Sequence, residues 1–94
     1  LRPLPEQLHQ VVEHGYDAFH PMDVGFDEHG AAVVTSAHLH GLLVNVWTVD
    51  VPERAVELAA LGVDGIITDY PDATRRAIER AFGPQRPAGL VATS

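Results

Sequence analysis

The sequence predicts an α/β fold in which three short parallel strands alternate with four helices, in the order α-β-α-β-α-β-α. One observation is a repeated joint, where an amphipathic stretch ends in glycine and a short apolar run follows. The joints are His14-Gly15-Tyr16, His40-Gly41-Leu42 and Leu61-Gly62-Val63. Glycine ends helices in the left-handed conformation at little cost, so each joint predicts a helix C-terminus. A second observation is "LLVNVWTV" at 42–49, whose nearly continuous apolar residues favour a parallel strand buried on both faces.

Proline and acidic residues mark where the predicted helices begin. Pro3 and Pro5 suit the first turn of the first helix, because an N-terminal turn tolerates the missing amide. We expect carboxylates or hydroxyls to cap the other three helices: Asp27, then Asp50, then Asp69 or Thr68. The predicted helices cover residues 4–14, 28–40, from Pro52 to Leu61, and 71–82.

The predicted strands cover residues 16–20, 42–49 and 63–69, which gives one structured domain over residues 1–83. Residues 84–94 are rich in proline and small residues and are expected to form a flexible tail.

Strands joined by helical crossovers run parallel with right-handed connections. Three such strands alone leave two open edges and a poorly covered face. Closure by five more strands into a (β/α)8 barrel would remove both faults, and an open doubly wound sheet is the alternative.

Composition excludes several classes of function. The formal net charge of −7 argues against a nucleic acid or an anionic membrane as partner, because both need basic patches. The chain has no cysteine, so it can form neither a disulfide framework nor a thiolate metal site. No apolar run approaches the roughly 20 residues that a transmembrane helix needs.

Two linked motifs in residues 44–72 carry a resemblance to a known family. "VNVWTVD" at 44–50 is followed, after a predicted helix, by "GVDGIITDYP" at 62–71. At this separation the pair resembles the C-terminal signature of the glycerophosphodiester phosphodiesterase family. The upstream "AHLHGLLV" at 37–44 is similar to the end of the preceding helix in that family. The resemblance extends over about residues 17–82.

The resemblance implies that the chain is the C-terminal portion of a (β/α)8 TIM barrel, with its strands at positions six, seven and eight. It also implies hydrolysis of glycerophosphodiesters to glycerol phosphate and an alcohol, with a divalent metal, Ca²⁺ or Mg²⁺, in the full-length enzyme. The family's catalytic His-Arg pair and its metal-binding Glu and Asp residues come from earlier strands. Neither His-Arg-Gly nor Glu-x-Asp occurs in this sequence. We therefore assign no catalytic residue and no metal ligand to this segment.

Barrel active sites lie at the carboxyl ends of the strands. In this sequence these ends are Phe19-His20, Trp47 to Asp50, and Thr68 to Asp72. Trp47 comes late in the strongest strand, where it can form an apolar wall for the glycerol or alcohol moiety, or else fill the core. The resemblance supports the role in the pocket. His20 ends the first strand just before Pro21 and is the second candidate for substrate binding, against the alternative of an ordinary surface histidine.

The other polar residues of these stretches are better explained structurally. Asp50, Thr68 and Asp69 follow strands and precede helices, so we favour helix capping over a role at the pocket mouth. His38 and His40 are two apart on a predicted helix and point to different sides, which disfavours a shared metal. Asp17 and Asp64 lie at strand starts, the end of a barrel that serves stability, and are expected to contact neighbouring loops.

Two hypotheses of function follow. The favoured one is a C-terminal segment of a metal-dependent glycerophosphodiester phosphodiesterase that is inactive as an isolated chain of 94 residues. Its partners would be the substrate and the rest of the barrel. The alternative is a non-catalytic partial barrel that associates with a copy of itself to cover its open edges. A different barrel enzyme with a phosphate site after its last strands is disfavoured, since Asp50 and Asp69 place negative charge there.

Overall fold

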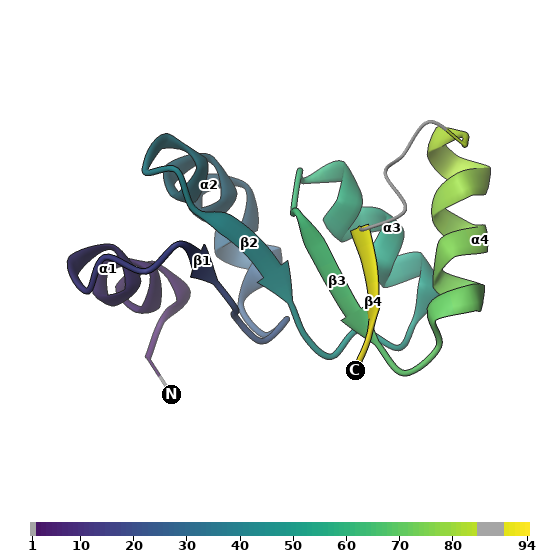
Figure 1. Ribbon diagram of the computed structural model, residues 1–94, viewed down its shortest axis with the longest axis horizontal. Coiled ribbons are helices and arrows are strands. Elements are labelled where there is room, and N and C mark those ends of the chain that lie inside the picture. Colours follow the sequence, from purple (N-terminus) through teal and green to yellow (C-terminus); the bar gives the residue numbers. More distant parts are fainter. Residues whose placement is uncertain (1, 85–89) are drawn as a thin grey trace.

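The computed structural model describes residues 2–84 and 90–94, which form four helices and four strands in strict alternation (Figure 1). The helices are α1 (Leu4–Glu13), α2 (Phe26–Leu39), α3 (Pro52–Ala60) and α4 (Pro71–Phe82). The strands are β1 (Ala18–Phe19), β2 (Leu43–Val46), β3 (Gly65–Thr68) and β4 (Val91–Thr93). Each predicted helix and strand is present, within a few residues of its predicted bounds.

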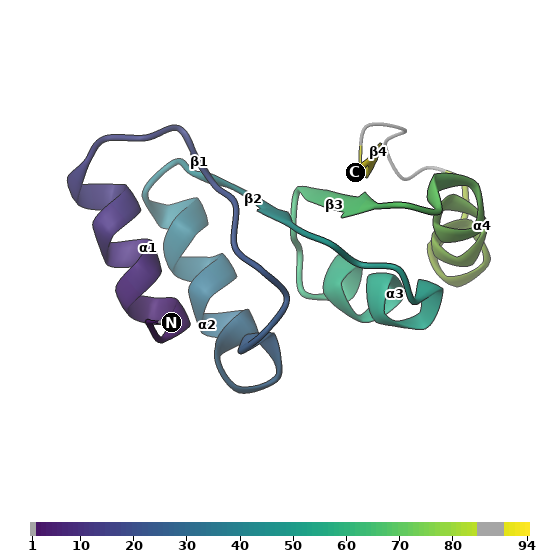
Figure 2. The same cartoon turned by 90° about the horizontal axis from the view of Figure 1, so that it is seen from below.

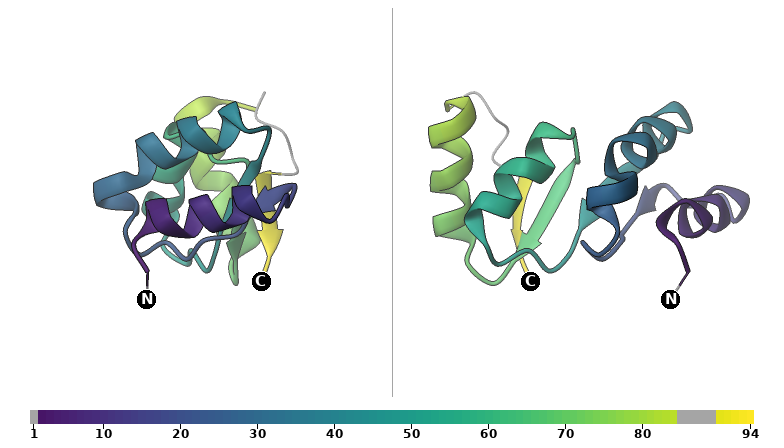
Figure 3. Two further views of the ribbon diagram at one scale, coloured as in Figure 1. Left: turned by 90° about the vertical axis from the view of Figure 1, so that its left-hand side faces the viewer. Right: turned by 180° about the vertical axis from the view of Figure 1, so that it is seen from behind.

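The strands form one parallel sheet in the order β1-β2-β3-β4, so each strand pairs with its neighbours in the sequence. Figure 2 shows α1, α2 and α3 on one side of this sheet, and α4 packs on α3 beyond β3. The strands lie in front of the helices in Figure 1, and the view from behind in Figure 3 shows the helices in front of the strands, so none of the described helices covers the opposite face. The structure confirms the predicted parallel α/β fold, and it adds a fourth strand to the predicted three.

The added strand, β4, lies within the segment that we predicted to be a flexible tail. Ile66, Ile67 and Thr68 of β3 pair in parallel with Val91, Ala92 and Thr93, and the Ser94 amide donates to the Thr68 carbonyl at 2.8 Å. The prediction of a flexible tail is therefore wrong for residues 90–94, because this short apolar stretch satisfies the free edge of β3. The part of the tail at 85–89 lies outside the described residues.

The core lies between the helices and one face of the sheet. Val44 and Val46 of β2, Ile66 of β3 and Leu58 of α3 are fully buried there. On the other face of β2, Leu43 is 54% exposed and Trp47, just beyond the strand, is 41% exposed. The prediction that residues 42–49 are buried on both faces is therefore wrong for the described chain, because helices cover only one of them.

The glycine joints between helices and strands have the predicted geometry. Gly41 and Gly62 adopt φ of +73° and +92°. Each is followed by an amide that reaches back to the last helical turn: Leu42 donates to the Ala37 carbonyl at 2.9 Å, and Val63 donates to the Leu58 carbonyl at 3.5 Å. Such joints satisfy the free carbonyls at the helix end and turn the chain into the next strand.

Helix starts differ from the prediction. The residues that precede α2, α3 and α4 are Gly25, Val51 and Tyr70, and no side chain caps any of the three helices. The predicted caps Asp27, Asp50 and Asp69 make other contacts, which are described with the site. Within the described residues, none of the helices is both long and apolar enough to cross a bilayer.

We predict that Gly30→Ala destabilises the protein although alanine favours helices by about 1 kcal/mol over glycine. Gly30 is buried inside α2, and a Cβ there would lie 2.8 Å from the Phe26 ring and 3.0 Å from Leu61. Overpacking of this kind costs about 1–3 kcal/mol. Urea unfolding would measure the loss. The control Ala31→Gly, at an exposed position of α2, should cost about 1 kcal/mol. A gain in stability for Gly30→Ala would contradict the packing argument.

Candidate functional site

Three segments meet at the carboxyl end of the sheet, and backbone hydrogen bonds hold them in register. The Trp47 amide donates to the Pro21 carbonyl, and the Asp23 amide donates to the Trp47 carbonyl, both at 3.2 Å. The Val49 amide donates to the Ile67 carbonyl at 2.8 Å. These bonds continue the parallel ladder beyond the regular strands, so the segments that follow β1, β2 and β3 form one rim. Active sites of parallel barrels lie on this side of the sheet.

Trp47 and His20, the two residues predicted to bind substrate, contact each other on this rim. The Trp47 indole nitrogen donates to the His20 carbonyl at 2.8 Å. Trp47 is not part of the buried core, and the bond fixes its ring across the ends of β1 and β2. The indole N–H is thereby satisfied while much of the ring stays accessible, which suits an aromatic wall for a partly apolar ligand.

Asp50, Thr68 and Asp69 form a polar cluster at the ends of β2 and β3. The Asp50 carboxylate accepts from the Asp69 amide at 2.9 Å and from the Thr68 hydroxyl at 3.3 Å. Thr68 is fully buried, and its hydroxyl oxygen accepts from the Tyr70 amide at 3.0 Å. The capping roles predicted for Asp50 and Asp69 are wrong, because Asp50 ties two strand ends together instead of binding the first amides of α3.

The two carboxyl groups of this cluster have opposite pKa shifts. The hydrogen bond from the Asp69 amide holds the pKa of Asp50 below its ordinary value, and the Thr68 hydroxyl adds to this effect. The pKa of Asp69 is raised, because its carboxyl hydrogen-bonds to the Asp50 carboxyl and is repelled by its charge. The pair therefore favours one negative charge and one shared proton over two charges as the pH falls toward the acidic range.

Arg54, on α3, is the centre of a second charged cluster, which the sequence analysis missed. Its guanidinium binds both carboxylate oxygens of Asp23, with contacts of 2.8–3.1 Å, and contacts Asp27 at 2.8 Å and Glu57 at 3.8 Å. Only 19% of the Arg54 side chain is exposed. The hydrogen bonds to Asp23 raise the pKa of Arg54, so it stays charged. The cluster attaches the loop after β1 to α3 and thereby supports the rim beneath Trp47.

The helix-end histidines contact different groups. His38 lies 2.7 Å from the Asp64 carboxylate, which also accepts from the Val44 amide at 2.8 Å. His40 lies 2.8 Å from the Ser36 carbonyl. Asp64 contacts neighbouring elements as predicted, at the end of the sheet opposite the rim. Among residues 2–84 and 90–94, no three histidine or acidic side chains are grouped so that they could hold a metal ion.

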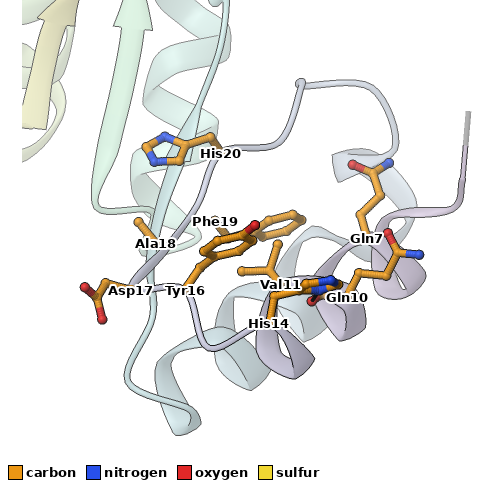
Figure 4. A pocket seen from close by; sticks show the side chains of 9 residues that line it. All are labelled: Gln7, Gln10, Val11, His14, Tyr16, Asp17, Ala18, Phe19 and His20. Carbon is orange, nitrogen blue, oxygen red and sulfur yellow. Dashed lines mark hydrogen bonds between the residues drawn. The ribbon is translucent and has the colours of Figure 1, made fainter.

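A broad open hollow of about 760 Å³ runs along the outer edge of β1 (Figure 4). Its lining comes from α1, β1 and the turn between them: Gln7, Gln10, Val11, His14, Tyr16, Asp17, Ala18, Phe19 and His20. Figure 4 shows His20 at one end of this hollow and Asp17 toward the other. The hollow lies beside β1, which is an edge strand of the sheet that the described residues form.

The fold and the rim define the class of protein: a parallel α/β barrel portion with its candidate site at the carboxyl ends of the strands. Residues 5–73 match the "Glycerophosphoryl diester phosphodiesterase family". The chain therefore belongs to this family, which confirms the resemblance carried by residues 44–72.

Two related proteins support the family and the fold. The protein named "Putative glycerophosphodiester phosphodiesterase YhdW" of Bacillus subtilis (strain 168) is 48% identical over 40 residues. A crystal structure titled as that of a "Putative glycerophosphoryl diester phosphodiesterase" from Silicibacter pomeroyi DSS-3 aligns with 80% of this chain, with a TM-score of 0.71 and 36% identity. This chain spans 16% of the Bacillus protein and 24% of the Silicibacter chain. The described elements thus correspond to part of a barrel.

We predict that the carboxyl pair makes stability depend on pH in two opposite ways. Because the pKa of Asp50 is lowered in the folded state, ionised Asp50 stabilises the fold at pH values above its ordinary pKa. This stabilisation is lost as the pH falls through the pKa of the folded state. The raised pKa of Asp69 has the reverse sign, so stability declines as the pH rises from about 4 through that pKa. The unfolding free energy of Asp69→Asn should therefore rise relative to that of the wild type toward pH 7, while that of Asp50→Asn should fall relative to the wild type. Urea unfolding at pH 3, 5 and 7 measures both, and parallel curves for all three proteins would contradict the pairing.

We predict that Arg54→Met costs about 1–2 kcal/mol of unfolding free energy, because Asp23 and Asp27 lose a charged donor that water replaces only in part. The matched control is Arg75→Met, which removes an exposed pair with Asp72 and should cost less than about 0.5 kcal/mol. Urea unfolding compares the two variants. Equal losses would show that the Arg54 cluster acts only as a surface pair.

Proposed function

We propose that this chain acts as the C-terminal part of a glycerophosphodiester phosphodiesterase, an enzyme that hydrolyses glycerophosphodiesters to glycerol phosphate and an alcohol. Family membership supports the reaction class. The observation that carries the proposal is the placement of Trp47, held by the His20 carbonyl at 2.8 Å on the rim where a barrel binds its substrate.

Trp47 and His20 are the substrate-binding residues that we propose. The accessible face of the indole can cover the carbon skeleton of the glycerol or alcohol moiety, since aromatic rings pack well on such partly apolar groups. The His20 side chain is exposed at the end of β1 and can donate to a hydroxyl or a phosphoryl oxygen. Asp50 and Asp69 make the neighbouring rim negative, so the phosphate would lie away from the ends of β2 and β3.

The chemistry itself would come from other parts of the enzyme. Among the described residues, no three histidine or acidic side chains are grouped so that they could hold a metal ion, and the Asp50 and Asp69 carboxyls hydrogen-bond to each other. We propose that the barrel strands contributed from elsewhere bind the divalent metal, Ca²⁺ or Mg²⁺, which would polarise the phosphoryl oxygens. This chain would contribute one wall of the cavity and would be inactive by itself.

A second candidate function is favoured by one specific observation. β4 covers the outer edge of β3, so the described chain already protects one edge that a three-stranded segment would leave open. This arrangement favours a non-catalytic partial barrel that assembles with another chain. The two candidates differ in whether residues 4–82 can serve in an active barrel.

The test is a chimera in which residues 4–82 replace the segment of the Silicibacter protein that aligns with them. We predict hydrolysis of glycerophosphocholine with Ca²⁺ or Mg²⁺, and a KM about tenfold higher for Trp47→Ala, equivalent to about 1.4 kcal/mol of binding, with a smaller change in kcat. The control is Tyr16→Ala, an exposed aromatic residue at the opposite end of β1. The isolated 94-residue chain should show no hydrolysis.

Two results would contradict the proposal. Metal-dependent hydrolysis by the isolated chain would place the catalytic groups within it. An active chimera with an unchanged KM for Trp47→Ala would remove Trp47 from the substrate site. A folded chimera without activity would favour the non-catalytic partial barrel.

A further inference from the structure

The backbone groups and the indole N–H of Trp47 all bind the segment 20–23, which follows β1. The indole N–H donates to the His20 carbonyl at 2.8 Å. The Trp47 amide donates to the Pro21 carbonyl, and the Trp47 carbonyl accepts from the Asp23 amide, both at 3.2 Å. Both the ring and the backbone of Trp47 are therefore tied to this segment. Its position determines where the two proposed substrate-binding residues lie.

Two features fix segment 20–23 in turn. Pro21 is fully buried, so it anchors the start of the segment. Near its end, the Asp23 carboxylate binds Arg54 of α3 through both oxygens, with contacts of 2.8–3.1 Å. Only 19% of the Arg54 side chain and 29% of the Asp23 side chain are exposed. A forked pair of this kind fixes the orientation of both groups as well as their distance, because two bonds remove the rotation that one bond allows.

The other carboxylates beside Arg54 do not belong to segment 20–23. Asp27 lies in the first turn of α2, and Glu57 lies on α3 together with Arg54. They contact the guanidinium at 2.8 Å and 3.8 Å, but their side chains are 90% and 66% exposed. Exposed ion pairs hold their partners weakly, because the solvent screens them. Asp23 is therefore the partner through which Arg54 acts on the rim.

The place of Arg54 in the sequence is unfavourable for the helix itself. It lies in the first turn of α3, where the positive end of the helix dipole disfavours a cation. Residues that break a local rule are expected at functional positions, where a gain elsewhere offsets the loss. The gain here is the contact with Asp23, which lies 31 residues away along the chain.

We propose that Arg54 and Asp23 are positioning residues of the substrate site. Their forked ion pair fixes segment 20–23, and this segment holds Trp47 where the substrate binds. Neither residue touches the substrate in this arrangement. The inference deepens the proposed function and rests on it for the role of Trp47 as a wall of the site. Displacement of such a wall weakens binding, because packing contacts fall off steeply with distance.

The fluorescence of the chain tests this directly, because Trp47 is its one tryptophan. We expect Arg54→Met to raise the acrylamide quenching constant about twofold, since an indole that loses the His20 carbonyl turns its N–H to water. The matched control is Ile78→Val, a buried position on α4 whose truncation costs stability without touching segment 20–23. It should leave quenching unchanged. Circular dichroism would verify that each variant is folded.

Arg54→Lys separates geometry from charge and is available if Arg54→Met fails to fold. Lysine keeps the positive charge near the rim, but it donates from a single nitrogen and cannot form the fork. Quenching of Trp47 should therefore rise in this variant as well.

The chimera tests the consequence for substrate binding. Arg54→Met and Arg54→Lys should each raise the KM for glycerophosphocholine about fivefold, with a smaller change in kcat, because a displaced wall weakens binding more than chemistry. Ile78→Val should leave KM unchanged. Since lysine keeps the charge, weaker attraction of the phosphate cannot explain an increase that both Arg54 variants share.

Three results would overturn the proposal. The first is unchanged quenching in both Arg54 variants, or an equal rise in Ile78→Val. The second is wild-type quenching and KM in Arg54→Lys, since charge alone would then suffice. The third is an active chimera in which Trp47→Ala raises KM and neither Arg54 variant does. An inactive chimera, or an unchanged KM for Trp47→Ala, would instead contradict the proposed function, and the quenching of the isolated chain would still decide whether Arg54 positions Trp47.

Discussion

The one-sided cover of the sheet is the constraint on which the rest of the structure depends. Consecutive parallel strands joined by right-handed crossovers place their helices on the same side, so the described helices leave the opposite face uncovered. Val44, Val46 and Ile66 are consequently buried, while Leu43 remains exposed on the same strand as the two valines. The uncovered face must be protected by curvature and closure, which is the physical reason for a barrel.

The rim combines two charged clusters that act differently. Arg54 offsets part of the negative charge of Asp23 and Asp27, and its forked hydrogen bonds to Asp23 hold the loop after β1, whose Asp23 amide donates to the Trp47 carbonyl. Within the described residues, no cation pairs with Asp50 or Asp69, and the Asp50 carboxylate accepts from the Asp69 amide and the Thr68 hydroxyl instead. One side of the rim is thus held by a largely buried cation, and the other carries a pair of carboxyl groups that can take up a proton.

Local patterns predicted the elements well, because proline, glycine and apolar runs act within a few residues. The four helices, the first three strands and the rim position of Trp47 and His20 all follow from such signals. Contacts between distant residues were not predictable in this way. Asp50 binds Asp69 rather than a helix start, and Arg54 binds Asp23, 31 residues away. β4 was missed because its pairing depends on the free edge of β3, not on its own composition.

The edge of β3 can therefore be paired in two ways, with β4 or with a strand from another part of a barrel. It offers one set of backbone groups, and either β4 or a strand from another part of a barrel can satisfy them, but not both. β4 has the advantage of a covalent link to α4, which makes its local concentration high. A strand from a larger barrel has the advantage of a covered second face, since its companions also bury Leu43 and Ile67. Burial of a whole sheet face removes more apolar area from water than three strand residues can, so the neighbouring strands of a complete barrel would displace β4 from the edge of β3.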